Sequence, residues 1–381
     1  MTAILSITAL TCVMCIFTIY AQTYNKIGGC SYFEFEDNSY NAKATKRDYS
    51  NIMDVAPNWN IYLSEDGKEY ALKRDHVVIY REVEDDFELG YIALKIPDKI
   101  TGKSKTRDVS AILGSVACHE FDLNPKNKYM SLIDNVVFSK DGKTLMSYAQ
   151  FDDRTVYEIP DGTNVINEYA FSDCNNIKQI TIPNSVTEIQ RGAFSMESLN
   201  KINIPPLVEV LDDTFIFSYN LEKVSIPKNS KLKKIDGGAF QKTKVSELTL
   251  PNFEVEISNL AFGEKEIAEK VKLKSYVKPN VSFECANNVC NLKWDNIANA
   301  SYYEVYQKKN DGSYKILKTV KGNSIKINSL KNDKKYTFAV KAVAEVKALP
   351  YNQDNYIVYF PDLPEYYTIE GTMSDDVTVV G

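Results

Sequence analysis

The sequence predicts a mainly β protein, in which a solenoid of short parallel strands is followed by a β-sandwich. An apolar residue and a proline recur between residues 159 and 251 at steps of 23, 22, 22 and 24 residues, a period typical of solenoid repeats. Apolar and polar residues alternate before most of these prolines, which indicates short half-buried strands. Residues 277–381 contain short strand-like segments with turn signals about every 8–12 residues, which favours a sandwich.

Length and composition limit the possible classes of protein. The 381 residues correspond to two or three domains at about 150 residues each, and 44% hydrophobic and 12% aromatic residues are enough to build a core. A net charge of -6 excludes the basic surface expected of a nucleic-acid-binding protein. Two histidines and seven cysteines argue against a His-rich metal enzyme or a disulfide-dense scaffold, and we predict no cofactor and no metal.

Residues 1–21 form the predicted signal peptide. Residues 2–21 are uncharged and mostly apolar, and a cut before Gln22 would place Ile19 and Ala21 at the positions read by the peptidase. One alternative is a retained span, since about 20 apolar residues cross a bilayer. Another is a lipid on Cys30, because residues 27–30 resemble a lipobox. We therefore expect a secreted or cell-surface protein that contacts membrane only through this leader or through Cys30.

Five cysteines follow the leader, an odd number that cannot pair completely. Cys285 and Cys290 flank Ala-Asn-Asn-Val, which is a plausible hairpin loop, so a disulfide between them is one expectation. Two reduced core thiols are the alternative.

The repeats share two patterns that predict how they stack. Four copies carry a frame of the form Leu-x-x-Ile-x-Ile-Pro, which reads as a short strand ended by proline, because proline cannot donate the next ladder hydrogen bond. Most copies then carry Ala-Phe, as in Ala193-Phe194, whereas the third copy has Thr214-Phe215 and implies a one-residue deletion or a substituted core position. Stacking the copies would join their strands into a parallel sheet and their phenylalanines into a continuous core.

Residues 161–189 carry the motif in its clearest form, Asp-Gly-Thr-Asn-Val-Ile-Asn-Glu-Tyr-Ala-Phe at its start, and resemble the BspA-type leucine-rich repeat of bacterial surface proteins. The resemblance covers about residues 90–270 and implies a leucine-rich-repeat solenoid. It includes a hairpin near residues 135–148, where Asp141-Gly142 is also a type I′ turn signal. A degenerate copy is expected to begin near Ile96-Pro97. Residues 22–89 lack the repeat register and are predicted to be an N-terminal cap or small β region, with a hairpin around Asp66-Gly67.

Residues 277–381 resemble a fibronectin type III module. Trp294 lies on the expected second strand, and Tyr336 follows Leu330 by six residues, so the resemblance implies that Tyr336 forms the tyrosine corner of this sandwich. The module departs from the pattern in a long tyrosine-rich stretch before its last strand. Aromatic side chains there either bind sugars or a protein partner or pack on the module itself; the predicted binding residues are Tyr356, Tyr359 and Phe360.

We find no pattern that indicates catalysis. Cys118 and His119 are adjacent on an extended segment, where side chains point to opposite faces, so we expect a structural role for both. No nucleophile elbow, phosphate loop or zinc-protease motif occurs in the sequence. We therefore predict that the protein is not an enzyme, and an enzyme within residues 22–135 is the least favoured alternative.

The polar positions between the apolar residues of the repeat strands should align from coil to coil and form a hydrated binding face. These predicted binding residues are Gln179, Thr181, Lys201, Asn203, Lys223, Ser225, Glu247 and Thr249. The two resemblances imply adhesion and protein interaction. We predict a non-catalytic, adhesin-like bacterial protein whose partner is a host or neighbouring-cell surface or matrix protein. The alternative is a carbohydrate-associated accessory protein that binds glycans through the C-terminal aromatics.

Overall fold

The computed structural model describes residues 119–123, 125–127, 130–350 and 362–381, together with the backbone of five earlier strands. The predicted leader, Cys30, Cys118, Tyr356, Tyr359 and Phe360 lie outside the described residues. The chain forms two compact units, residues 1–154 with 166–176 and residues 155–165 with 177–381. The short strand β11 (Val165–Ile166) falls at their boundary.

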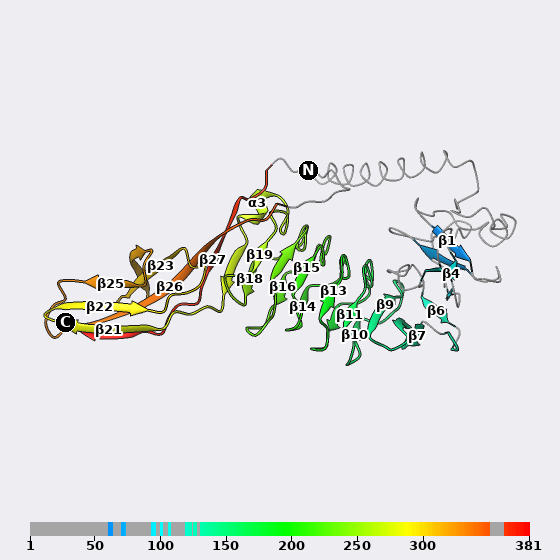
Figure 1. Cartoon of the computed structure of the whole chain (residues 1–381), viewed down its shortest axis with the longest axis horizontal. Coiled ribbons are helices and arrows are strands. Elements are labelled where there is room, and N and C mark those ends of the chain that lie inside the picture. Colours follow the sequence, from blue (N-terminus) through cyan, green and yellow to red (C-terminus); the bar gives the residue numbers. More distant parts are fainter. Residues whose placement is uncertain are drawn as a thin grey trace. The chain divides into compact units, whose positions relative to one another are not determined.

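The described residues of the first unit form three groups of strands (Figure 1). The first group comprises β1 (Asn60–Leu63), β2 (Tyr70–Lys73), β4 (Ile100–Thr101) and β5 (Thr106–Arg107), with β1 and β2 antiparallel as the hairpin signal predicts. The second pairs β3 (Ala93–Ile96) in parallel with β6 (Glu120–Leu123), the arrangement expected of a degenerate repeat coil. The third is the antiparallel set β7 (Met130–Ile133), β8 (Val136–Ser139) and β9 (Thr144–Tyr148).

The predicted hairpin near residues 135–148 is present, but its predicted type I′ turn is wrong. Lys140 to Lys143 form a four-residue loop between β8 and β9, in which only Gly142 has a positive φ. The two-residue turn joins β7 to β8 instead, where Asp134 and Asn135 both have positive φ, 50° and 58°, as a type I′ turn requires. Asp141 accepts hydrogen bonds from the Ser139 hydroxyl and the Lys143 N–H, which stabilise the wider loop.

The second unit contains the solenoid, whose strands form two rows (Figure 1). The first row consists of the strands that precede the repeat prolines, together with strands that pair in register with them. In each strand, a buried or half-buried residue stands between more exposed ones. These are β10 (Val156–Glu158), β12 (Gln179–Thr181), β14 (Lys201–Asn203), β16 (Lys223–Ser225), β18 (Glu247–Leu250) and β20 (Lys272–Ser275). The second row comprises β13 (Glu188–Ile189), β15 (Val210–Asp212), β17 (Lys234–Asp236) and β19 (Glu256–Ile257), and helix α3 (Lys265–Ala268) follows the last of these.

Phenylalanine rings form the solenoid core. Phe194, Phe215, Phe240 and Phe262 are buried, and successive ring centroids lie 5.8, 5.6 and 5.6 Å apart with nearly parallel planes. Since an offset stack of aromatic rings adds to the stabilisation from burial, this column links consecutive coils. In the third copy, Thr214 is fully buried where other copies have alanine, so this copy has a substituted core position. It is also one residue shorter, because Phe215 follows Pro205 by ten residues and Phe194 follows Pro183 by eleven.

Two sheets form the sandwich. One contains β21 (Val281–Ala286), β22 (Val289–Trp294) and β25 (Ser324–Ile327). The other contains β23 (Tyr302–Lys308), β24 (Tyr314–Val320), β26 (Lys335–Lys347) and β27 (Tyr366–Glu370), with β28 (Val377–Val380) paired to β26. Strand β27 also pairs in parallel with β20, so this sheet is continuous with the first row of the solenoid.

Details of the sandwich follow the sequence pattern. Trp294 is buried against Tyr303, and the Tyr336 hydroxyl accepts a hydrogen bond from the backbone N–H of Lys331 at 3.1 Å, as in a tyrosine corner. Cys285 and Cys290 face each other across the β21–β22 hairpin and form a disulfide. The turn between them uses Asn287 and Asn288, both with positive φ.

Candidate binding surface

The predicted binding residues of the solenoid lie on the outer side of its first row of strands. Lys201 is in register with Lys223, and Asn203 with Ser225, in the parallel pair β14–β16. All eight predicted residues are exposed except Thr249, which is half-buried. Strand β20 extends the face, because Lys274 pairs with Thr249 in register and forms an ion pair with Glu247 at 2.7 Å. Whether this face binds a partner stays a prediction.

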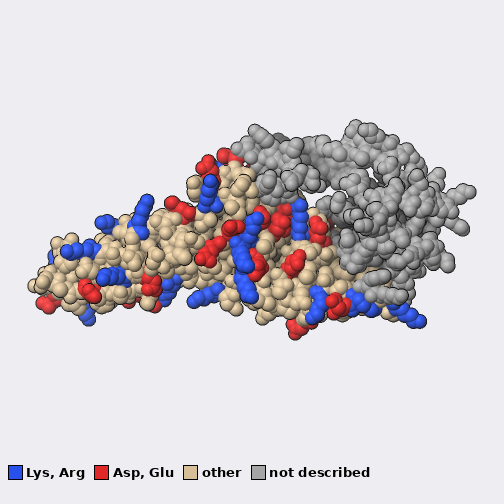
Figure 2. Space-filling view, in the orientation of Figure 1, with Lys and Arg blue, Asp and Glu red and all other residues tan. Residues whose placement is uncertain are grey.

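Charges of both signs lie close together over the repeats on the face shown in Figure 2. A mixed distribution of this kind creates no extended field of one sign, so it favours short-range recognition over long-range electrostatic steering.

The second row of strands carries a cluster of three aspartates, Asp212, Asp213 and Asp236, that the sequence pattern did not indicate. Asp213 is buried, forms an ion pair with Arg191 at 2.7 Å and accepts a hydrogen bond from the Gly238 N–H. Burial, together with the neighbouring carboxylates of Asp213 and Asp236, raises the pKa of Asp212. Next to this group, a hollow of about 620 Å³ is lined by both apolar and charged side chains, including Val210, Arg191 and Glu188.

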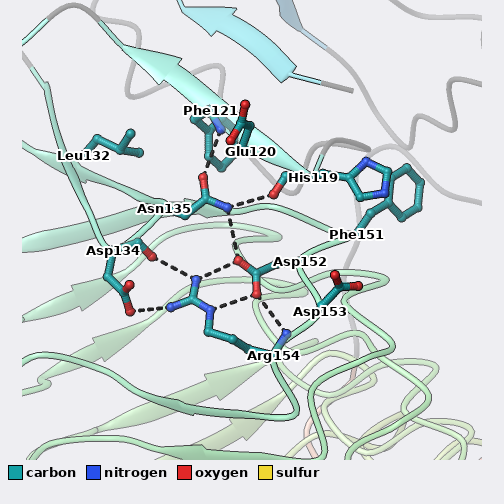
Figure 3. A pocket seen from close by; sticks show the side chains of 10 residues that line it. All are labelled: His119, Glu120, Phe121, Leu132, Asp134, Asn135, Phe151, Asp152, Asp153 and Arg154. Atoms are coloured by element: carbon teal, nitrogen blue, oxygen red, sulfur yellow. Dashed lines mark hydrogen bonds and ion pairs between the residues drawn. The ribbon is translucent and has the colours of Figure 1, made fainter. Parts of the chain in front are cut away.

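A second hollow, of about 670 Å³, lies in the first unit (Figure 3). Arg154 lies below its centre and contacts two of the acidic residues there: its guanidinium bonds both carboxylate oxygens of Asp152 at 2.8 Å and reaches the Asp134 side chain and carbonyl. Burial raises the pKa of Asp152, but the hydrogen bonds from Arg154 and Asn135 outweigh burial, so the pKa is lowered overall. Because Arg154 is committed to these carboxylates, we assign it the role of joining the β7–β8 turn to the segment after β9.

His119 lies at the edge of this hollow. Its ring packs on Phe151 with centroids 5.3 Å apart, and its carbonyl accepts a hydrogen bond from the Asn135 side chain at 2.7 Å. These contacts agree with the expected structural role of His119. Its expected neighbour Cys118 lies outside the described residues, so the Cys118–His119 relationship stays a prediction.

A third hollow, of about 410 Å³, opens beside the first row of strands. Two predicted binding residues, Asn203 and Ser225, line it together with Tyr276 and other uncharged residues. The hydroxyl of Tyr276 donates a hydrogen bond to the carbonyl of Ile226 at 3.0 Å. Sequence reasoning missed this hollow, because Tyr276 follows the last repeat strand and no periodic pattern connects it to the earlier coils.

An exposed aromatic pair marks the divergent third copy. Phe217 and Tyr219 are each 46% exposed, and their ring centroids lie 6.2 Å apart. Phe217 has a positive φ of 63°, which is unusual for a bulky residue; the corresponding turn positions, Asp173 and Lys242, also have positive φ but carry polar side chains. The exposed pair could have been predicted from the sequence, because aromatic residues replace polar ones at these two turn positions of the third copy.

Most of the tyrosine-rich stretch lies outside the described residues, including Tyr356, Tyr359 and Phe360, so their predicted role stays a prediction. Two tyrosines that follow it are described and behave differently. Tyr366 is 58% exposed, whereas Tyr367 is 4% exposed and packs against the solenoid core.

The described part of the chain offers neither a metal-binding cluster nor a membrane-spanning helix. No group of three or more His, Cys, Asp or Glu side chains there is placed to hold a metal ion. No helix among the described residues is both long and apolar enough to cross a membrane.

Comparison with known families agrees with both resemblances. The model of the BspA type leucine rich repeat region matches residues 146–269 in six copies. The model of a PBP1-like, fibronectin3-like domain matches residues 279–348. The fold is therefore a leucine-rich-repeat solenoid followed by a fibronectin type III-like sandwich, as predicted.

Solved structures give similarities at low identity. A leucine-rich repeat protein from Eubacterium ventriosum is 21% identical with a TM-score of 0.32, over 45% of this chain and 58% of that chain. The pneumococcal vaccine antigen PcpA is 19% identical with a TM-score of 0.36, over 49% and 51%. An Fn3-like protein from Clostridium thermocellum is 19% identical with a TM-score of 0.18, over 26% and 86%. This chain therefore spans little more than half of the first two proteins, and no curated protein matches it.

Proposed function

We propose that this protein, which carries BspA-type leucine-rich repeats followed by a fibronectin-like module, is a non-catalytic binding protein that is secreted or held at a bacterial cell surface. Its partner is a surface or matrix protein of a host or neighbouring cell. The families that match residues 146–269 and 279–348 are typically non-catalytic, and the two resemblances imply protein interaction for the repeats and spacing or binding for the sandwich. The proposed location follows from the resemblance of the repeats to those of bacterial surface proteins.

The alignment of exposed side chains along the first row of strands carries this proposal. Residues of neighbouring strands stand directly opposite each other, as Lys201 and Lys223 do, and parallel strands lie about 4.8 Å apart. The face therefore presents regularly spaced polar groups on a backbone that the stacked core holds rigid. Because a rigid face loses little conformational entropy on binding, a partner can gain affinity from many weak contacts.

The exposed pair Phe217 and Tyr219 supports the same function. Protein interfaces concentrate their binding energy in a few large aromatic side chains surrounded by polar groups. Asn220, next to Tyr219, accepts a hydrogen bond from the Lys244 ammonium at 2.7 Å, so a polar contact lies beside this pair in the chain. The pair lies on the turn that leads into β16 and provides a second contact region on the solenoid.

A charge-reversal experiment tests the strand face. The full chain is screened by biolayer interferometry against purified collagen, laminin, fibronectin and mucin, and every binder is measured again with the K201E/K223E variant. We expect the affinity of that variant to fall about tenfold or more, because two carboxylates replace the two ammonium groups that would contact the partner at the centre of the face. A K315E/K318E variant in the sandwich is the control, since it lowers the net charge equally, from -6 to -10. Equal affinity of both variants for every binder would contradict the proposal.

A further inference from the structure

The hollow at Asn203, Ser225 and Tyr276 differs in charge from the two larger hollows. Its lining residues are Asn184, Asn203, Ile204, Pro206, Ser225, Ile226, Pro227, Asn229 and Tyr276, none of which carries a formal charge. The hollow near Asp152 and the one near Arg191 are each lined by several charged side chains. In a chain with 25% charged residues, a neutral lining spanning several coils indicates a neutral ligand.

The polar groups of this hollow are available to a ligand. Within the described residues, no hydrogen bond engages the side chains of Asn184, Asn203 or Asn229, nor the hydroxyl of Ser225. Each amide offers two N–H donors and one acceptor oxygen, and the hydroxyl offers both functions. Such a set is complementary to ligand groups that also donate and accept. A carboxylate or an ammonium group would instead lose hydration without meeting an opposite charge among these lining residues.

Apolar contacts come from the same coils. Pro206, Pro227 and Tyr276 line the hollow and are half-buried, so they offer apolar surface to a ligand, whereas Ile204 and Ile226, at 2% exposure each, offer almost none. Tyr276 is fixed at two points, because its hydroxyl bonds the Ile226 carbonyl and its backbone N–H bonds the Leu250 carbonyl at 3.2 Å. A ring held in this way binds with little further loss of conformational entropy.

The geometry points to a binding site for a neutral glycan in this hollow. Sugar hydroxyls both donate and accept hydrogen bonds, as the three amides and Ser225 do, and the C–H faces of a sugar ring suit contact with Tyr276 and the two prolines. The volume of about 410 Å³ lies within the range of about 300–1,000 Å³ found for small-ligand pockets. This site is separate from the predicted aromatics Tyr356, Tyr359 and Phe360, and it does not depend on protein binding by the strand face.

Titration of the full chain with defined oligosaccharides tests this inference. The neutral probes are cellohexaose, maltohexaose, mannohexaose and xylohexaose, and the acidic probes are a hyaluronan oligosaccharide and oligogalacturonate. Binding is measured by saturation-transfer difference NMR and calorimetry. We expect at least one neutral probe to bind more tightly than both acidic probes. We also expect its affinity to fall about tenfold or more in the N203A/N229A variant, because two hydrogen-bonding side chains are removed.

Matched variants localise the site. Asn200 is an exposed asparagine just before β14 that does not line the hollow, so N200A should bind as the wild-type chain does. The Y276L variant should lose binding, while circular dichroism verifies that the fold is kept. The inference is overturned if no neutral probe binds, if an acidic probe binds more tightly, or if N203A/N229A keeps the wild-type affinity. K201E/K223E should keep glycan binding, so failure of this site and failure of the strand face are distinguishable.

Discussion

The ring of Tyr367 packs against Phe262 with centroids 5.9 Å apart and planes at 70°, so a residue of the sandwich continues the phenylalanine column of the solenoid. The Tyr367 hydroxyl donates a hydrogen bond to the carbonyl of Ser258 at 3.0 Å, across 109 residues of sequence, and burial raises the pKa of this hydroxyl. Solenoids need a terminal cap to cover their last core layer. Strand β27 therefore caps the C-terminal end of these repeats.

Removing the Tyr367 ring should destabilise the second unit. We expect Y367A to lower its free energy of unfolding by about 3–5 kcal/mol, as for other large aromatic side chains cut from a core. Y367F should cost only about 1 kcal/mol, because it removes one hydrogen bond and keeps the ring. Chemical denaturation measures both values. Y366A is the control, and because Tyr366 is exposed its effect should stay within about 0.5 kcal/mol.

Gly237 is predicted to resist substitution. Its φ is +52°, and a Cβ there would lie 2.6 Å from the carboxylate oxygens of Asp212 and Asp213. Asp213 cannot easily yield, since Arg191 and the Gly238 N–H hold its carboxylate. G237A should therefore cost more than the roughly 1–2 kcal/mol that a left-handed conformation imposes on a residue with a Cβ.

Gly312 provides the comparison for this prediction. It also has a positive φ, +84°, but a Cβ added to it would meet no atom within 4 Å. G312A should show the backbone cost alone, and chemical denaturation of both variants gives the comparison. Equal losses of unfolding free energy in the two variants would show that the approach of Asp212 and Asp213 to Gly237 has no energetic effect.

Acid should weaken the network around Asp152. Burial opposes ionisation of this carboxyl, but the hydrogen bonds from Arg154 and Asn135 prevail and place its pKa below the ordinary value of 3.8. At pH values above this ordinary pKa, the ionised Asp152 therefore stabilises the folded state. This stabilisation is lost as the pH falls through the lower pKa of the folded state. We expect the unfolding free energy of the wild-type chain to fall more steeply below about pH 4 than that of D152N. Superimposable pH profiles for the two proteins would contradict this prediction.

The Cys285–Cys290 disulfide closes a very short loop, with a sequence separation of 5. The entropy of the unfolded chain that such a loop removes is small, so we expect C285S/C290S to lose only about 2 kcal/mol. The hairpin itself should persist, because Asn287 and Asn288 provide the turn and β22 also pairs with β25. Equilibrium unfolding is measured for the wild-type chain with and without reductant and for the double variant, which checks the small loss of stability and the persistence of the hairpin. Loss of the whole sandwich on reduction would contradict both expectations.

Several features could be predicted from local sequence because their causes lie within one repeat or one hairpin. The strand that ends at each proline, the phenylalanine that each coil contributes to the ring column and the tyrosine corner at Tyr336 are all encoded within short windows. The type I′ turn is not at Asp141-Gly142, because four residues separate β8 from β9, whereas two residues, Asp134 and Asn135, separate β7 from β8. Positive φ at both residues, rather than composition alone, identifies the true turn.

The repeat period, the alternation of buried and exposed positions and the change to a sandwich near residue 277 can all be predicted from the amino-acid sequence, because each depends on regular spacing of apolar residues. The packing of Tyr367 on the solenoid core, and the meeting of Tyr276 with Asn203 and Ser225 in a neutral hollow, could not be predicted in this way. These residues become neighbours only when the coils stack and β27 pairs with β20. A local sequence pattern cannot predict contacts between residues that lie so far apart in the chain.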